Sequence, residues 1–213
     1  MRSTRRMPGN PWPHDMMIRI DDWPHAVNLL LFVRYAWGLA PDADVPALDP
    51  EPQPGTSSVP PQASLDEWSR RWERQWQRTW EWHAMHEPAT LPTPELLRTV
   101  NRPGQPLNPV IPPHWFAEYG DAGVDRKALT GWEGQLIPIH GRQPVSETPE
   151  RVCLPALISA WETGVEELIT PPYVGYFARR ISRRVLVVSR TTRETPEFYN
   201  KALAMAAEQR WNG

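Results

Sequence analysis

The segment RRVLVVSRTTRETPEFYNKALAMAAEQRW, from Arg183 to Trp211, decides the fold class. Its VLVV run is apolar and mostly β-branched, which is typical of a buried strand. Thr195 and Pro196 then give a capping residue followed by proline at the first helical position, and the remaining residues have helical apolar spacing. The segment therefore predicts a buried strand followed closely by a helix.

Strands and helices alternate through much of the remaining chain. We expect strands at residues 16–20 (MMIRI) and 134–141 (GQLIPIHG). A helix capped by Asp22 and ended by Gly38 follows the first strand, and a helix at 148–169 follows the second. This alternation predicts an α/β fold, with a small, mainly parallel sheet and flanking helices.

Two proline-rich segments, residues 41–61 and 88–115, interrupt this pattern. Their composition predicts extended chain that packs along a surface or reaches a neighbour. A flexible N-terminal arm is expected at residues 1–15, which are basic and proline-rich. The organisation we predict is a single α/β domain at 16–213, with a proline-rich and tryptophan-rich insertion at about 41–115.

The insertion contains EWSRRWERQWQRTWEW, residues 67–82, in which Ser64 and Glu67 have capping-box spacing. A spacing of four residues places the tryptophans along one helical face, with most charges opposite. That separation disfavours a stacking surface for single-stranded nucleic acid. Two alternatives stay open: the indoles are buried against this chain, with the proline-rich segments covering the rings and accepting their N–H groups, or they form an interface. The predicted interface residues are Trp68, Trp72, Trp76, Trp80 and Trp82.

Charge and composition limit the partners. Lysine and arginine total 23 against 25 acidic residues, so we expect no nucleic-acid partner. A weaker alternative is nucleic-acid binding through the basic N-terminal arm and a local cluster of Arg179, Arg180, Arg183 and Arg184. Arginines at a sheet edge would instead explain that cluster as protection against edge pairing. The apolar run at 26–40 is interrupted by Arg34 and is too short to span a bilayer.

Other biases indicate the compartment and source. A single cysteine, Cys153, is typical of a reducing compartment, and the near absence of lysine indicates a GC-rich bacterial or phage genome. We expect a soluble protein that is cytoplasmic, or that lies within a virion or assembly formed in the cytoplasm.

The sequence lacks the common catalytic and cofactor motifs, so we expect no cofactor and no metal, and we favour a non-enzymatic protein. His83 and His86 have no third ligand at metal spacing and are expected at the surface near a helix end. Cys153 has no local histidine signature and is expected to be a small buried residue.

One constellation could still form a ligand site. Ligands bind beyond the carboxyl ends of strands in open parallel sheets. Those ends would bring together Asp21, Asp22, His140, Arg142, Ser189, Arg190, Thr191, Thr192 and Arg193. Such groups could bind a phosphate or carboxylate, with His140 as acid or base.

The leading functional hypothesis is a non-enzymatic protein–protein interaction protein, a subunit or accessory component of a larger assembly. Phage-type structural or assembly components, immunity proteins and adaptors all fit it. Its partners would be other protein chains or a second copy. The alternative is a small α/β enzyme or ligand-binding domain that uses the anion site at the strand ends.

Overall fold

The computed structural model of the chain describes residues 11–85, 112–137 and 144–209. These residues gather into two compact units, which are described separately. The organisation as one domain with an insertion stays a prediction. Unit 1 comprises the described residues of 1–24, 45–51 and 133–213, and unit 2 those of 25–44 and 52–132.

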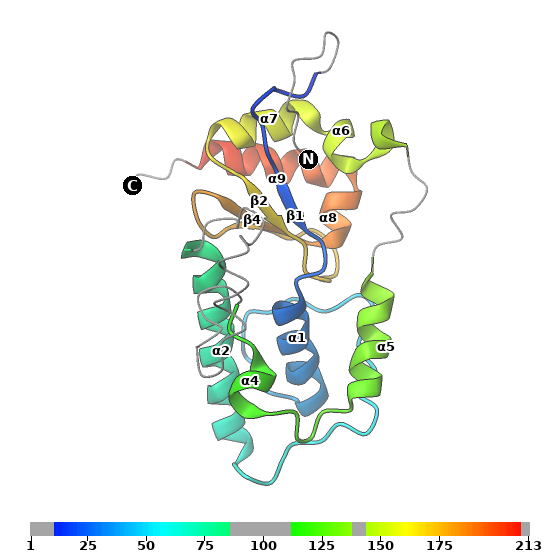
Figure 1. The fold of residues 1–213 in the computed structure, drawn as a ribbon, viewed down its shortest axis with the longest axis vertical. Coiled ribbons are helices and arrows are strands. Elements are labelled where there is room, and N and C mark those ends of the chain that lie inside the picture. The colour runs from blue at the N-terminus through cyan, green and yellow to red at the C-terminus, as the bar shows by residue number, and fades with distance from the viewer. Residues whose placement is uncertain (1–10, 86–111, 138–143, 210–213) are drawn as a thin grey trace, which may run out of the picture. The chain divides into compact units, whose positions relative to one another are not determined.

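Unit 1 contains a four-stranded mixed sheet, in the order β1-β2-β4-β3 (Figure 1). Strands β1, β2 and β4 are parallel, and β3 is an antiparallel edge strand beside β4. The α/β prediction is therefore confirmed at the level of a small mixed sheet with flanking helices. The strands are β1 (Arg19–Asp21), β2 (Glu167–Ile169), β3 (Ala178–Arg180) and β4 (Val185–Val188).

Helices cover one face of this sheet. In Figure 1, α7 and α9 lie over the same face, and their apolar residues pack with Leu168 and Leu186 of the central strands. Leu157 of α7 and Ala202 of α9 are fully buried in that core. The helical elements of unit 1 are η1 (Val145–Glu147), α6 (Pro149–Val152), α7 (Leu154–Glu162), α8 (Arg190–Glu194) and α9 (Pro196–Glu208).

The deciding segment forms the predicted strand and helix, with a short helix between them. All four residues of β4 are buried, and α9 begins at Pro196 as expected. The sequence prediction missed α8. Ser189 caps α8 by accepting a hydrogen bond from the Thr192 N–H at 3.0 Å.

The strand predicted at 134–141 is wrong over its described residues, 134–137. Residues 134–136 are the last turn of α5 (Arg126–Leu136), and residues 138–141 lie outside the described part of the chain. Leu129, Trp132 and Leu136 form a buried stripe at helical spacing, so this apolar run belongs to a helix.

The helix predicted at 148–169 ends early. The first turns form α6, and α7 then ends at Glu162. Gly164 follows with φ of 104°, a left-handed value that glycine adopts readily and other residues disfavour. The backbone change there allows residues 167–169 to become β2, which pairs on both sides.

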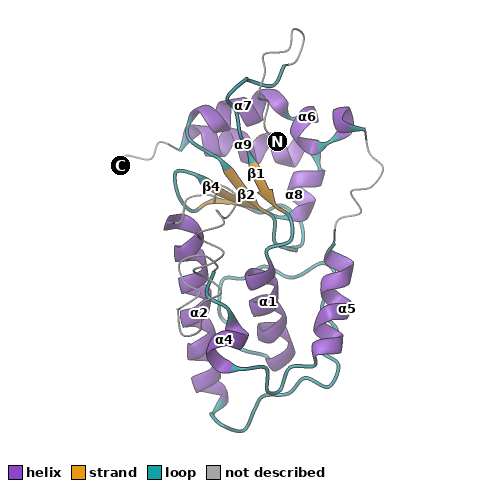
Figure 2. Ribbon diagram, viewed as in Figure 1, coloured by secondary structure: helices purple, strands orange, loops and turns teal. Residues whose placement is uncertain are grey.

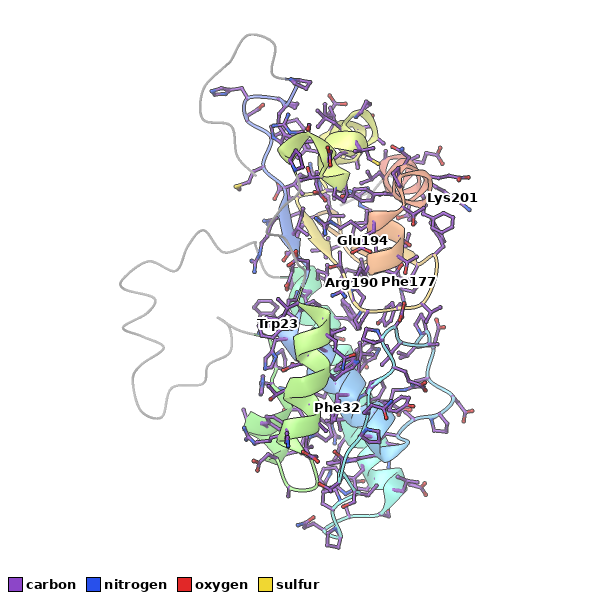
Figure 3. The ribbon with its side chains drawn as sticks, turned by 90° about the vertical axis from the view of Figure 1, so that its right-hand side faces the viewer. Trp23, Phe32, Phe177, Arg190, Glu194 and Lys201 are labelled. Atoms are coloured by element: carbon purple, nitrogen blue, oxygen red, sulfur yellow. The ribbon has the colours of Figure 1, made fainter. Side chains whose placement is uncertain are left out.

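Unit 2 consists of helices joined by loops (Figure 2). Helix α1 ends as predicted, because Gly38 has φ of 64° and the Leu39 N–H donates to the Arg34 carbonyl at 3.0 Å. Phe32 of α1, labelled in Figure 3, packs against Trp132. The helices are α1 (His25–Trp37), α2 (Leu65–Met85), α4 (Trp115–Tyr119) and α5 as far as Trp132.

The first proline-rich segment packs along both units. In unit 1 the Val174 N–H donates to the Ala47 carbonyl at 2.8 Å. In unit 2 the Ser58 N–H donates to the carbonyl of Gly123 at 2.9 Å. Gly123 has φ of 77°, and a Cβ there would lie 2.2 Å from the Ser58 carbonyl oxygen, so glycine is required.

Asp125 fixes the same segment to the start of α5. Its carboxylate accepts hydrogen bonds from the N–H and hydroxyl of Thr56 and from the N–H groups of Lys127 and Ala128. These donors favour the charged form and lower the pKa of Asp125 to about 2. The residue is therefore both the cap of α5 and the anchor of the extended segment.

Candidate functional site

The hydroxyl groups beyond β4 are used inside unit 1. Ser189 is fully buried, and its hydroxyl donates to the Gly175 carbonyl at 2.5 Å. The Thr192 hydroxyl, also buried, accepts from the Phe177 N–H at 2.8 Å. Together they attach α8 to the loop before β3, while Thr191 is half-buried. Two of the residues predicted for the strand-end site, Ser189 and Thr192, are thus engaged in bonds within the fold.

Arg193 forms a buried ion pair with Glu150 of α6. The guanidinium donates to the two carboxylate oxygens at 2.8 and 3.2 Å, and the Tyr199 hydroxyl donates to the same carboxylate at 3.4 Å. Burial alone would lower the pKa of Arg193, but the Glu150 carboxylate outweighs it and raises that pKa. Burial raises the pKa of Tyr199 well above its usual value. This network joins α6, α8 and α9.

The other residues predicted at the strand ends have separate environments. Arg190 begins α8 and donates to the Leu136 carbonyl; Figure 3 labels it with Glu194 at the other end of the helix. Asp21 ends β1, and burial raises the pKa of its carboxyl against the opposing effect of Arg19. Asp22, which follows β1, is half-buried, and the last two predicted site residues, His140 and Arg142, lie outside the described residues.

Arg180 has a structural role that the sequence did not indicate. It is buried on the helix-covered side of β3 and donates to the carbonyls of Thr163, Ala206 and Gln209. Those carbonyls lie at the ends of α7 and α9, where a positive charge is favourable. Burial lowers the pKa of Arg180. Of the basic cluster at 179–184, this arginine is unavailable to a nucleic acid.

Helix α2 is capped as predicted, and its buried face is rotated from the tryptophan series. The Ser64 hydroxyl accepts from the Glu67 N–H at 3.2 Å. Each step of four residues turns about 40° around the helix axis, so tryptophans spaced by four move progressively away from one straight face. Side chains spaced by alternating steps of three and four residues stay on the same face. The buried side chains of α2 are Trp68, Trp72, Gln75, Thr79 and His83.

The inner two tryptophans belong to the core of unit 2. The indole N–H of Trp72 donates to the Leu30 carbonyl of α1 at 2.7 Å. That of Trp68 donates to the carbonyl of Pro60 at 3.1 Å, which confirms for Trp68 the expected acceptor from the proline-rich segment. Trp68 also contacts the rings of Trp37 and Trp115. Of the predicted interface residues, Trp76, Trp80 and Trp82 are therefore the ones left as candidates for contact with a partner.

Trp76 and Trp80 form what we call the outer indole row. Both are half-buried, and they continue a series of ring contacts that begins in the core. Trp76 stacks on Trp72 with ring centroids 5.2 Å apart, and Trp80 meets Trp76 edge-on at 5.3 Å. Trp82 lies on the other flank of the buried stripe and is also half-buried.

His83 and Cys153, which were considered as a metal ligand and a reactive thiol, are both buried. His83 is 5% exposed, so its predicted surface position is wrong; it follows the buried stripe of α2. His86 lies outside the described residues. Cys153 is buried as expected, and burial raises the pKa of its thiol. Among the described residues, no group of three or more His, Cys, Asp or Glu could hold a metal ion.

Within the described ranges, no helix has both the length and the apolar character needed to cross a membrane. Neither protein-family models, nor curated proteins, nor solved structures show a match to this chain. Two arrangements bear on function: the buried polar network around Arg193 and Glu150 in unit 1, and the outer indole row of unit 2.

Proposed function

We propose that this chain is a non-enzymatic protein–protein interaction protein, a subunit or accessory component of a larger assembly. The outer indole row is its docking surface. The observation that carries the proposal is the half-burial of Trp76 and Trp80 beside a core that already contains Trp68 and Trp72. Partly exposed tryptophans on a rigid helix combine large contact area with little loss of conformational freedom on binding.

The state of the strand ends also supports an interaction role over a ligand site. Ser189 and Thr192 bond within the fold, and Arg193 is neutralised by Glu150. A phosphate or carboxylate ligand would have to displace those contacts. Breaking a buried ion pair typically costs about 3–5 kcal/mol, which weak anion binding would not offset.

Isolation of the tagged chain from its native source tests the proposal. We expect a defined partner with the native chain and its loss with Trp80→Ala. Leu65→Ala is the matched control, because Leu65 is an exposed apolar residue at the other end of the same helix. A monomeric mass by light scattering over a range of concentrations, together with no partner that depends on Trp80, would contradict the proposal.

A further inference from the structure

We propose that the outer indole row binds a basic segment of a partner protein, whose arginine or lysine side chains lie over the indoles and pair with adjacent carboxylates of α2. This inference rests on the proposed function and names the chemistry of the partner.

The charged side chain of α2 nearest the row is that of Glu73, and Glu81 follows about 100° further around the helix axis from Trp80. At about 100° per residue, Glu73 lies within about 20° of Trp80 and about 60° of Trp76 around the helix axis. Glu81 directly follows Trp80 in the sequence and accepts a hydrogen bond from Gln77 at 2.7 Å. Both glutamates are exposed. In the part of the chain that the structure describes, neither forms an ion pair with an arginine or lysine.

Acidic groups near the other flank of α2 do have basic partners. Arg78 pairs with Glu118 of α4 at 2.6 Å, and Arg71 pairs with Glu67 at 3.0 Å. The charges of that flank are therefore largely compensated within unit 2. The row of Trp76 and Trp80 differs from it, because no basic side chain of the described ranges pairs with Glu73 or Glu81.

The first turns of α2 contain a complete version of the arrangement we propose. The Arg71 guanidinium lies 4.6 Å from the ring centroid of Trp68 while it pairs with the neighbouring Glu67. An indole face and an adjacent carboxylate thus hold one guanidinium together, by cation–π attraction and charge. Trp80 with Glu73 and Glu81 presents the same two groups, and no arginine of the described residues pairs with either glutamate there. A partner's cation would complete the set.

A binding experiment with defined peptides tests this chemistry. The probe is a fluorescent amphipathic peptide of leucine and arginine, about 18 residues long, and its counterpart has glutamate in place of arginine. The variant is Glu73→Lys/Glu81→Lys. The control is Glu162→Lys/Glu194→Lys, which makes the same change in net charge at exposed residues of unit 1. Anisotropy titrations of the full chain are run at physiological salt.

We expect the arginine peptide to bind the native chain and the control alike, and to bind the Glu73→Lys/Glu81→Lys variant at least about tenfold more weakly, since two attractive contacts become repulsive. The glutamate peptide should bind the native chain more weakly than the arginine peptide. Equal binding of both peptides, or equal loss in the variant and the control, would overturn the basic-partner inference and leave the proposed interaction function standing. If neither peptide binds and no native partner depends on Trp80, both proposals fail.

Discussion

Replacing Glu150 by glutamine tests whether the strand-end residues are structural. The carboxylate is 1% exposed and receives both hydrogen bonds of the Arg193 side chain, so Glu150→Gln leaves a buried guanidinium without its counter-charge. Removing one partner of a buried ion pair costs about 3–5 kcal/mol. Glutamine still accepts one hydrogen bond, so we expect a loss near the lower end, about 3 kcal/mol. That is a large part of a typical domain stability of about 5–15 kcal/mol.

The assay is urea denaturation followed by far-UV circular dichroism, with the midpoint and slope fitted for each variant. Glu166→Gln is the matched control, because Glu166 pairs with Arg184 at 2.9 Å at the surface, where such pairs contribute about 0–1 kcal/mol. The apolar double variant Glu150→Leu/Arg193→Met removes both charges and should recover most of the lost stability.

Equal losses for Glu150→Gln and Glu166→Gln would refute this reasoning. The buried pair would then contribute no more than a surface pair. Ser189, Arg190 and Arg193 would have to be considered again as groups available to a ligand.

Three further predictions concern unit 2. Trp72→Ala should lower the free energy of unfolding by about 3–5 kcal/mol, while Trp80→Ala, at the half-buried edge, should cost clearly less in the same urea titration; equal losses would place both rings in one environment. Gly123→Ala should lower the melting temperature, because the added Cβ meets the Ser58 carbonyl oxygen at 2.2 Å in a left-handed backbone conformation; an unchanged melting temperature would contradict that contact. Asp125 should titrate in NMR with a pKa of about 2, so its stabilising effect is complete above the unfolded value near 3.8 and is lost as the pH falls through about 2; a midpoint near 3.8 would mean that its hydrogen bonds are absent in solution.

The sequence predicted those parts of the fold whose signals are local. The VLVV strand, the Pro196 start of α9, the Gly38 end of α1 and the Ser64 cap of α2 all depend on residues within one or two turns. The three-residue strand β2 depends instead on pairing with strands distant in sequence, and its own residues read equally well as helix. The short apolar run at 134–141 was predicted as a strand, but its first residues belong to α5. The helical spacing of the buried residues becomes visible only when the pattern is followed back to Leu129.

The surroundings of the candidate residues could not be predicted from local patterns. Ser189, Thr192 and Arg193 are close neighbours in the sequence, but the burial of Glu150 beside Arg193 joins residues 43 positions apart. The difference in burial between Trp72 and the two half-buried tryptophans, Trp76 and Trp80, could have been predicted from the sequence. A straight helix has about 3.6 residues per turn, so an unbroken spacing of four must carry Trp76 and Trp80 away from the centre of the face that contains Trp72.

Hydroxyl-radical footprinting of the tryptophans, read by mass spectrometry, tests the interaction account most directly. In the isolated chain, Trp76 and Trp80 should be oxidised faster than Trp72, which is fully buried. In the assembly isolated from the native source, oxidation of Trp76 and Trp80 should fall to the level of Trp72, while an exposed residue such as Met85 serves as the reference for radical dose. Unchanged oxidation of Trp76 and Trp80 between the isolated chain and the assembly would contradict the claim that the outer indole row is the docking surface.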